Sequence, residues 1–187
     1  MNPNVAIVIA LVIGIVIGAV VIYALQMSRT RRLRQRFGPE YERVVTETGD
    51  RAKAEAALEG RQKRVLKYNI RPLDATDRVH FQERWPQIQA RFVDDPARAL
   101  TEADRLIGEV MAAEGYPMQE FDQQAADISV EHPTVVENYR EGHLIAVTNT
   151  QGRASTEDLR KAMIHYRTLF QELVGPADYA TAERTRL

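Results

Sequence analysis

The sequence predicts an all-α protein with one N-terminal transmembrane helix, a basic helical stalk and a bundle of about five helices. Three observations lead to this prediction. Residues 5–25 are apolar without interruption, and the apolar residues that follow recur mostly at helical spacing. No period-2 pattern bounded by turn signals is long enough to compete with these helices.

The apolar run VAIVIALVIGIVIGAVVIYAL, residues 5–25, carries no charge. About 20 residues at 1.5 Å each cross roughly 30 Å of hydrocarbon, so the run has the length of a membrane span. The alternative is a cleaved signal peptide, which the sequence disfavours. The preceding residues 1–4 carry no basic side chain, the run is long, and Ala24-Leu25-Gln26 is a poor cleavage site. We therefore expect a short tip over residues 1–4 and a retained helix over 5–25.

A cluster of arginines follows the apolar run and forms a basic juxtamembrane flank: Arg29, Arg31, Arg32, Arg34 and Arg36. The positive-inside rule places this end in the cytoplasm. We expect a single-pass protein of the cell membrane with its N-terminus outside and its C-terminal domain cytoplasmic. We favour the interpretation that the flank only sets the topology. The second interpretation is that the flank is a specific site for anionic lipids.

Small residues recur every four positions along the apolar run, at Ala6, Ala10, Gly14 and Gly18. The last two form a GxxxG motif, which lets two membrane helices approach closely. The stripe predicts a homodimer through the transmembrane helix. The alternative is that Gly and Ala are simply common in membrane helices.

Charge divides the remainder of the chain. Residues 26–71 hold 13 Arg and Lys against 6 Asp and Glu, and residues 72–187 hold 12 against 20. The distal net charge of −8 argues against a nucleic-acid partner and favours a basic protein partner. The chain has no cysteine, which excludes disulfides, thiolate metal sites and cysteine nucleophiles.

The predicted stalk covers residues 26–71. The first helix is expected to continue to Phe37, and Gly38-Pro39 interrupts it. A second helix ends at Thr48-Gly49-Asp50, and a third covers residues 51–68. The apolar seam of the third helix is thin, so we expect it to be a solvated stalk that buries little.

The predicted bundle covers residues 72–176, and punctuation divides it into helices. The first carries Trp85 within an apolar stripe, with a kink or break expected near Pro86. The second begins with Asp95 as N-cap and ends at Gly115. A short helix, a helix from His132-Pro133 to about Asn149 and a helix from a capping box at Ser155 to Gly175-Pro176 follow. Residues 177–187 read as a disordered tail.

No local motif points to catalysis, a metal or a cofactor. The histidines, at positions 80, 132, 143 and 165, form no HxxxH or HExxH pattern. His143 and His165 lie on the last two long predicted helices, so whether they meet stays open. We therefore expect a non-enzymatic interaction or scaffold protein with no catalytic residue, no metal and no cofactor. A small-ligand sensor and an enzyme assembled across helices are the alternatives.

Several short motifs together resemble a group of uncharacterised bacterial proteins with an N-terminal apolar segment and a helical region. These are RFGPEY at residues 36–41, RFVDDP at 91–96, GYP at 115–117, HP at 132–133 and STEDLR at 155–160. The resemblance covers most of residues 33–174. It implies a bacterial origin and this order of helices, and it implies no activity.

Overall fold

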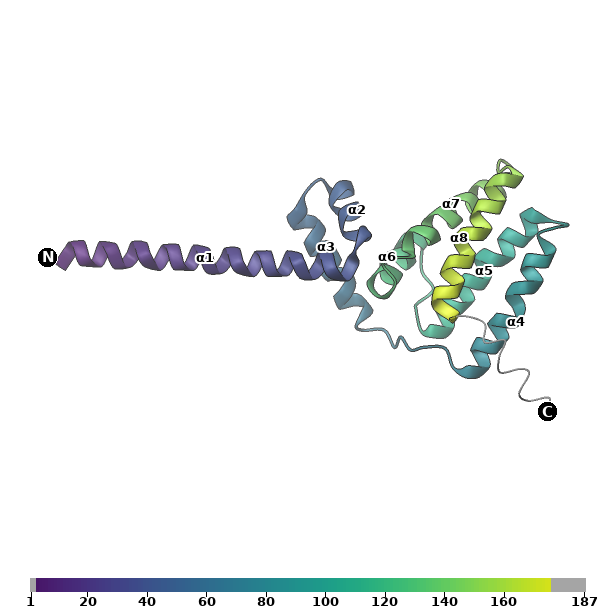
Figure 1. Cartoon of the computed structure of the whole chain (residues 1–187), viewed down its shortest axis with the longest axis horizontal. Helices are drawn as coiled ribbons and strands as arrows, with labels where there is room; N and C mark the ends of the chain where they lie inside the picture. Colours follow the sequence, from purple (N-terminus) through teal and green to yellow (C-terminus); the bar gives the residue numbers. More distant parts are fainter. Residues whose placement is uncertain (1–2, 176–187) are drawn as a thin grey trace. The chain divides into compact units, whose positions relative to one another are not determined.

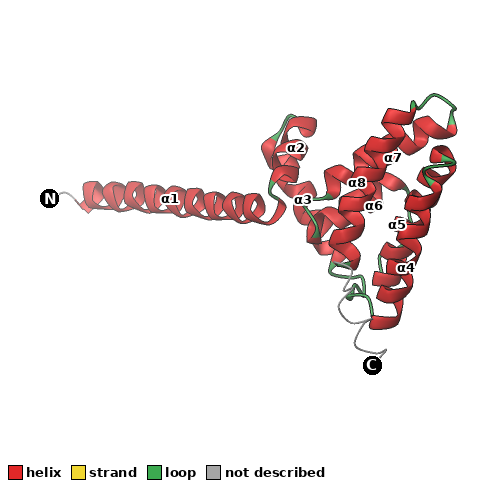
Figure 2. Ribbon diagram, turned by 45° about the vertical axis from the view of Figure 1, so that its right-hand side comes forward, coloured by secondary structure: helices red, strands yellow, loops and turns green. Residues whose placement is uncertain are grey.

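The computed structural model describes the backbone of residues 3–175 and the side chains of residues 11–175. Within that range all regular secondary structure is helical (Figure 2), which confirms the all-α prediction. The eight helices described are α1 (Pro3–Phe37), α2 (Pro39–Thr48), α3 (Arg51–Val65), α4 (Ala75–Arg91), α5 (Pro96–Glu114), α6 (Phe121–Glu131), α7 (Val136–Thr150) and α8 (Thr156–Val174). The predicted disordered tail, residues 177–187, lies outside the described residues.

The contacts divide the chain into two compact units, residues 1–58 and 59–187, and the division falls within α3. The domain ranges predicted from the sequence rest on apolar content, charge and helix punctuation instead of contacts, and they stay predictions. They are 1–4, 5–25, 26–71, 72–176 and 177–187. Each unit is described by itself below.

The first unit contains α1, α2 and the beginning of α3. One described helix, α1, is long and apolar enough to cross a membrane by length and composition, over Leu11–Phe37 (Figure 1). Its apolar side chains from Leu11 to Leu25 are exposed. Beyond them the unit buries a small apolar cluster: Leu33, Phe37, Tyr41, Val44, Ala54 and Leu58. The beginning of α3 therefore buries more apolar surface than its thin seam predicts.

The second unit holds one continuous core to which α4, α5, α6, α7 and α8 contribute, and α6 packs on α7 (Figure 1). Helix α5 lies at its centre, where Leu100, Leu106, Ile107 and Val110 are fully buried. Trp85 of α4 stacks on Phe170 of α8 with ring centroids 4.8 Å apart. Trp85, which the sequence places in an apolar stripe, is thus part of the core of this unit.

Capping residues set several helix ends. The Asp95 side chain accepts from the backbone N–H of Arg98 at 3.1 Å, and Ser155 and Asp158 form a capping box. Helix α5 ends at Gly115 in the left-handed conformation.

Three predicted helix limits differ from the structure. Helix α3 ends at Val65 rather than 68, because residues 66–68 form a turn. Helix α4 continues through Pro86, so of the kink or break expected there the break is absent. Helix α7 begins at Val136, after a turn that contains Pro133.

Candidate functional site

The predicted packing stripe on α1 is open at its two described positions. Apart from its chain neighbours and the nearby backbone of its own helix, a Cβ atom built on Gly14 or Gly18 meets no atom within 4 Å. The side chains of Ala6 and Ala10 lie outside the described residues. The backbone at the GxxxG motif is therefore accessible within this chain, and self-association through it stays a prediction.

The basic flank is only partly a solvated surface. The Nε of Arg29 lies 3.9 Å from Glu55 Oε2, and Arg34 pairs with Glu42 at 3.1 Å. Arg31, Arg32 and Arg36 have exposed side chains. Arg29 and Arg34 thus take part in contacts within residues 1–58.

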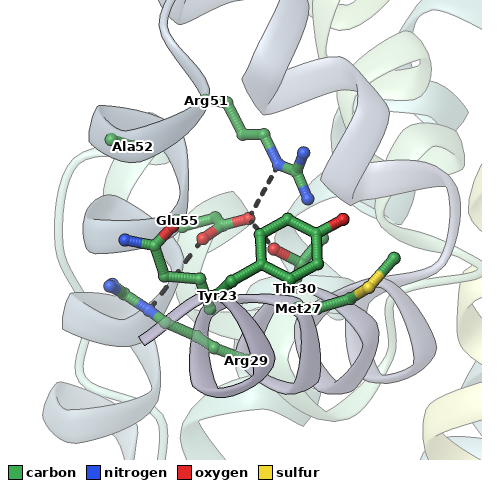
Figure 3. Close-up of a pocket in the computed structure, with 8 residues that line it drawn as sticks. Tyr23, Met27, Arg29, Thr30, Arg51, Ala52 and Glu55 are labelled. Atoms are coloured by element: carbon green, nitrogen blue, oxygen red, sulfur yellow. Dashed lines mark hydrogen bonds and ion pairs between the residues drawn. The ribbon is translucent and has the colours of Figure 1, made fainter. Parts of the chain in front are cut away.

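A buried carboxylate joins the three helices of the first unit. Glu55 of α3 is 7% exposed, and its Oε1 accepts hydrogen bonds from Thr30 of α1 at 2.7 Å and from Tyr41 of α2 at 2.9 Å. The Nε of Arg51 donates to the same oxygen at 3.1 Å (Figure 3). We call these four side chains the Glu55 cluster.

The hydrogen-bond donors of the Glu55 cluster determine the charge state of the Glu55 carboxylate. Burial alone would raise the pKa of Glu55, but the hydrogen bonds from Thr30, Tyr41 and Arg51 outweigh burial and lower it. The carboxylate is therefore charged at neutral pH. A small cavity of about 320 Å³ lies beside the cluster, lined by Tyr23, Met27 and Ala52 among others (Figure 3).

Glu55→Gln should lower the stability of the first unit in a pH-dependent way. Because the folded pKa of Glu55 lies below its ordinary value of 4.5, its stabilisation is present above that value. It is lost as the pH falls through the folded pKa. Thermal unfolding of the full chain in mild detergent should show a loss of about 1 kcal/mol at pH 7, after allowance for solvent screening, that shrinks in acid. A loss that is equal at pH 7 and in acid would show that the charge does not matter.

A second carboxylate, Asp127 of α6, is 2% exposed and organises one side of the second unit. Its Oδ1 accepts two hydrogen bonds from Arg64, at 2.8 and 2.6 Å, and one from Gln123 at 2.9 Å. Its Oδ2 accepts from Tyr68 at 2.9 Å. Asp127 thereby attaches the end of α3 and the turn after it to α6.

The two histidines left open by the sequence have different partners. His143 Nδ1 lies 3.3 Å from Asp104 Oδ1, and its ring stacks on Phe121. His165 Nδ1 lies 2.9 Å from Asn138 Oδ1. Within the described residues, no group of three or more His, Cys, Asp or Glu side chains is placed to hold a metal ion.

Asp104 also accepts a hydrogen bond from the hydroxyl of Tyr166. Burial, followed by the charge of Asp104, raises the pKa of this phenol, so it stays protonated and acts as a donor. The Tyr166 ring packs closely on Gly142, where an added Cβ would lie 2.9 Å from a ring carbon. The Asp104, His143 and Tyr166 contacts therefore connect α5, α7 and α8.

Comparison with known proteins finds no matching family model, no similar curated protein and no similar solved structure. The resemblance of the RFGPEY and RFVDDP motifs to uncharacterised bacterial proteins stays a prediction.

Proposed function

We propose that this chain is a membrane-anchored, non-enzymatic interaction or scaffold protein. The observation that carries the proposal is the uncovered apolar surface of α1. Large apolar side chains between Leu11 and Leu25 are 50% exposed or more, and an α-helix satisfies its own backbone hydrogen bonds. Water is an unfavourable environment for a surface of this extent, whereas a bilayer covers it.

In the proposed arrangement α1 crosses a bacterial cell membrane once, with the N-terminus outside. The arginine flank lies on the cytoplasmic side, where the positive-inside rule places it. The Glu55 cluster begins at Thr30, about 8 Å beyond Leu25 along the helix. Residues 26–71 act as a basic stalk, and a five-helix bundle over 72–176 is presented to the cytosol.

The proposed partner of the bundle is a basic protein. Residues 72–187 carry a net charge of −8, which attracts basic surfaces at low ionic strength. Full-length protein in detergent should capture a basic partner from lysate at low salt and release it as the salt screens the charges. Capture that does not depend on salt would contradict this assignment.

Charged substitutions in α1 test the anchor. In Val16→Arg/Val20→Arg, two arginines replace apolar side chains near the centre of the run, each at a cost of about 2.5–3.5 kcal/mol for insertion. We expect this variant to leave the membrane fraction, and the control Gln35→Arg, an exposed position in the flank, to stay in it. The intact mass of the membrane-bound protein must include residues 1–25, since their loss would identify a signal peptide.

A reporter fused after Leu187 tests the orientation. We expect a fluorophore that matures only in the cytosol to be active there and alkaline phosphatase to be inactive. Phosphatase activity without fluorescence would place the C-terminal domain outside.

Gly14→Ile tests the proposed homodimer. The branched side chain occupies the space that a second helix needs for close approach. We expect the variant to lose the dimer signal in a membrane two-hybrid assay. The control Val12→Ile places the same isoleucine side chain at an exposed position outside the stripe, and it should retain the signal. Equal signals from both variants and the natural chain would exclude this face.

A further inference from the structure

A cavity of about 570 Å³ lies in the second unit, at the end of α5. The segment that follows α3 forms one wall with Leu66 and Ile70, and Leu173 of α8 contributes another apolar surface. Cavities of roughly 300–1,000 Å³ with apolar walls and a few polar groups are typical of small-molecule sites. This volume is sufficient for a small organic molecule.

Two buried residues that line the cavity each have a side-chain oxygen without a hydrogen-bond partner. Glu114 is 6% exposed and Tyr116 is 4% exposed. Among the residues that the structure describes, Glu114 Oε2 and Tyr116 Oη are the buried side-chain oxygens or nitrogens without a partner. Buried polar atoms are nearly always paired, because an unpaired one has lost its water and gained nothing in return. Two such oxygens beside one cavity point to a ligand that donates to them.

The charges around these two oxygens favour a cation. Glu131 also lines the cavity, and His132 beside it lies 3.2 Å from Glu172. Burial raises the pKa of Tyr116, and the charges of Glu114, Glu131 and Asp127 raise it further. This second effect reports a negative potential at the phenol. Arg71 also lines the cavity, and its side chain is exposed to solvent.

The backbone around the cavity is held in place before any ligand arrives. The N–H of Arg71 donates to the carbonyl oxygen of Glu114 at 2.9 Å. Gly115 has a φ of +99°, and a Cβ at this position would lie 2.4 Å from the carbonyl oxygen of Asn69. The segment from Asn69 to Arg71 can lie this close to α5 because position 115 is glycine. Because this part of the cavity wall is already ordered, ligand binding loses less conformational entropy there.

We propose that this cavity binds a small organic cation, a primary ammonium group with an apolar substituent. The ammonium N–H groups donate to Glu114 Oε2 and Tyr116 Oη, and the substituent lies against Leu66, Ile70 and Leu173. This inference goes beyond the interaction function proposed above and does not depend on membrane insertion.

The protonation of Glu114 fits this assignment. Burial raises its pKa to about 7, because the charged carboxylate loses its hydration there. An ammonium group would supply a positive charge beside it, and the carboxyl proton would leave to solvent as the ligand enters.

Titration of the full chain in detergent with butylammonium tests the proposal, with 1-butanol and butyrate as neutral and anionic probes of similar size. Nuclear magnetic resonance of ring-labelled tyrosine follows binding, and Tyr116→Phe identifies the Tyr116 signal. We expect saturable butylammonium binding in the millimolar range and no saturation with the other two probes. Glu114→Gln should weaken binding about tenfold or more, and Tyr116→Phe about threefold, because the charged acceptor is the stronger one.

Glu141→Gln is the matched control, since Glu141 is exposed and lies outside the cavity wall. It should bind butylammonium as the natural chain does. The proposal is overturned if none of the probes binds, or if 1-butanol or butyrate binds as tightly as butylammonium. Unchanged binding by Glu114→Gln also overturns it. If Glu114→Gln does not fold, Tyr116→Phe replaces it in the test, because this variant removes one oxygen only. Unchanged butylammonium affinity in Tyr116→Phe then overturns the proposal.

Discussion

Replacing Gly115 by alanine is expected to destabilise the second unit by about 2–4 kcal/mol. Two effects combine at this position. Its φ of +99° is a conformation that alanine adopts with strain. The added Cβ would also lie 2.4 Å from the carbonyl oxygen of Asn69, and a backbone atom cannot move aside without displacing its whole segment. Chemical unfolding of the full chain, followed by circular dichroism, measures the loss.

Gly108→Ala on the same helix is the control for Gly115→Ala. Gly108 lies inside α5, and its added Cβ would meet only the end of the Met118 side chain, at an ordinary 3.6 Å. Since alanine favours a helix interior by up to about 1 kcal/mol over glycine, this variant should be neutral or more stable. Similar losses in both variants would show that the close approach of Asn69 to Gly115 is not what stabilises the turn.

The ends of most helices could be predicted from the sequence because their signals are local. Gly38-Pro39, Asp95-Pro96 and the capping box at Ser155 each act within about four residues of the helix end that they set. Two prolines are exceptions. The sequence predicts a helix start at Pro133, but this residue lies in a turn, and α7 begins only at Val136. Pro86 lies in the middle of α4, which nevertheless continues to Arg91.

The candidate sites could not be predicted, because their partners are far apart in the chain. Glu55 meets Thr30 across 25 residues, and Asp127 meets Arg64 across 63. On a helix rich in charged residues, an acidic side chain is ordinarily assigned to the solvated face. Glu114 gives the same local signal as an exposed glutamate, although the fold buries it beside a cavity. Sequence periodicity identifies the apolar face of a helix. Which charged residues are buried together with that face depends on the tertiary packing.

Asp127→Ala should lower the stability of the second unit by about 2–4 kcal/mol, which is a large share of the free energy of unfolding of a typical domain. The substitution removes the acceptor for Arg64, Tyr68 and Gln123 at once. Arg64 is about one third exposed, so water compensates part of its loss, and the expected cost lies below that of a fully buried pair. Asp122→Ala, at an exposed position on the same helix, should cost less than about 1 kcal/mol.

A double-mutant cycle with Arg64→Met separates the ion pair from the rest of the Asp127 contacts. If Arg64 and Asp127 stabilise the fold mainly through each other, the double variant should lose about 1.5 kcal/mol less than the sum of the two single variants. Additive losses would mean that Tyr68 and Gln123 carry the effect of Asp127. In that case Tyr68→Phe, which removes one donor to Oδ2 while keeping the ring, should reproduce part of the Asp127→Ala loss. The cycle therefore decides whether the end of α3 is attached to α6 by charge or by neutral hydrogen bonds.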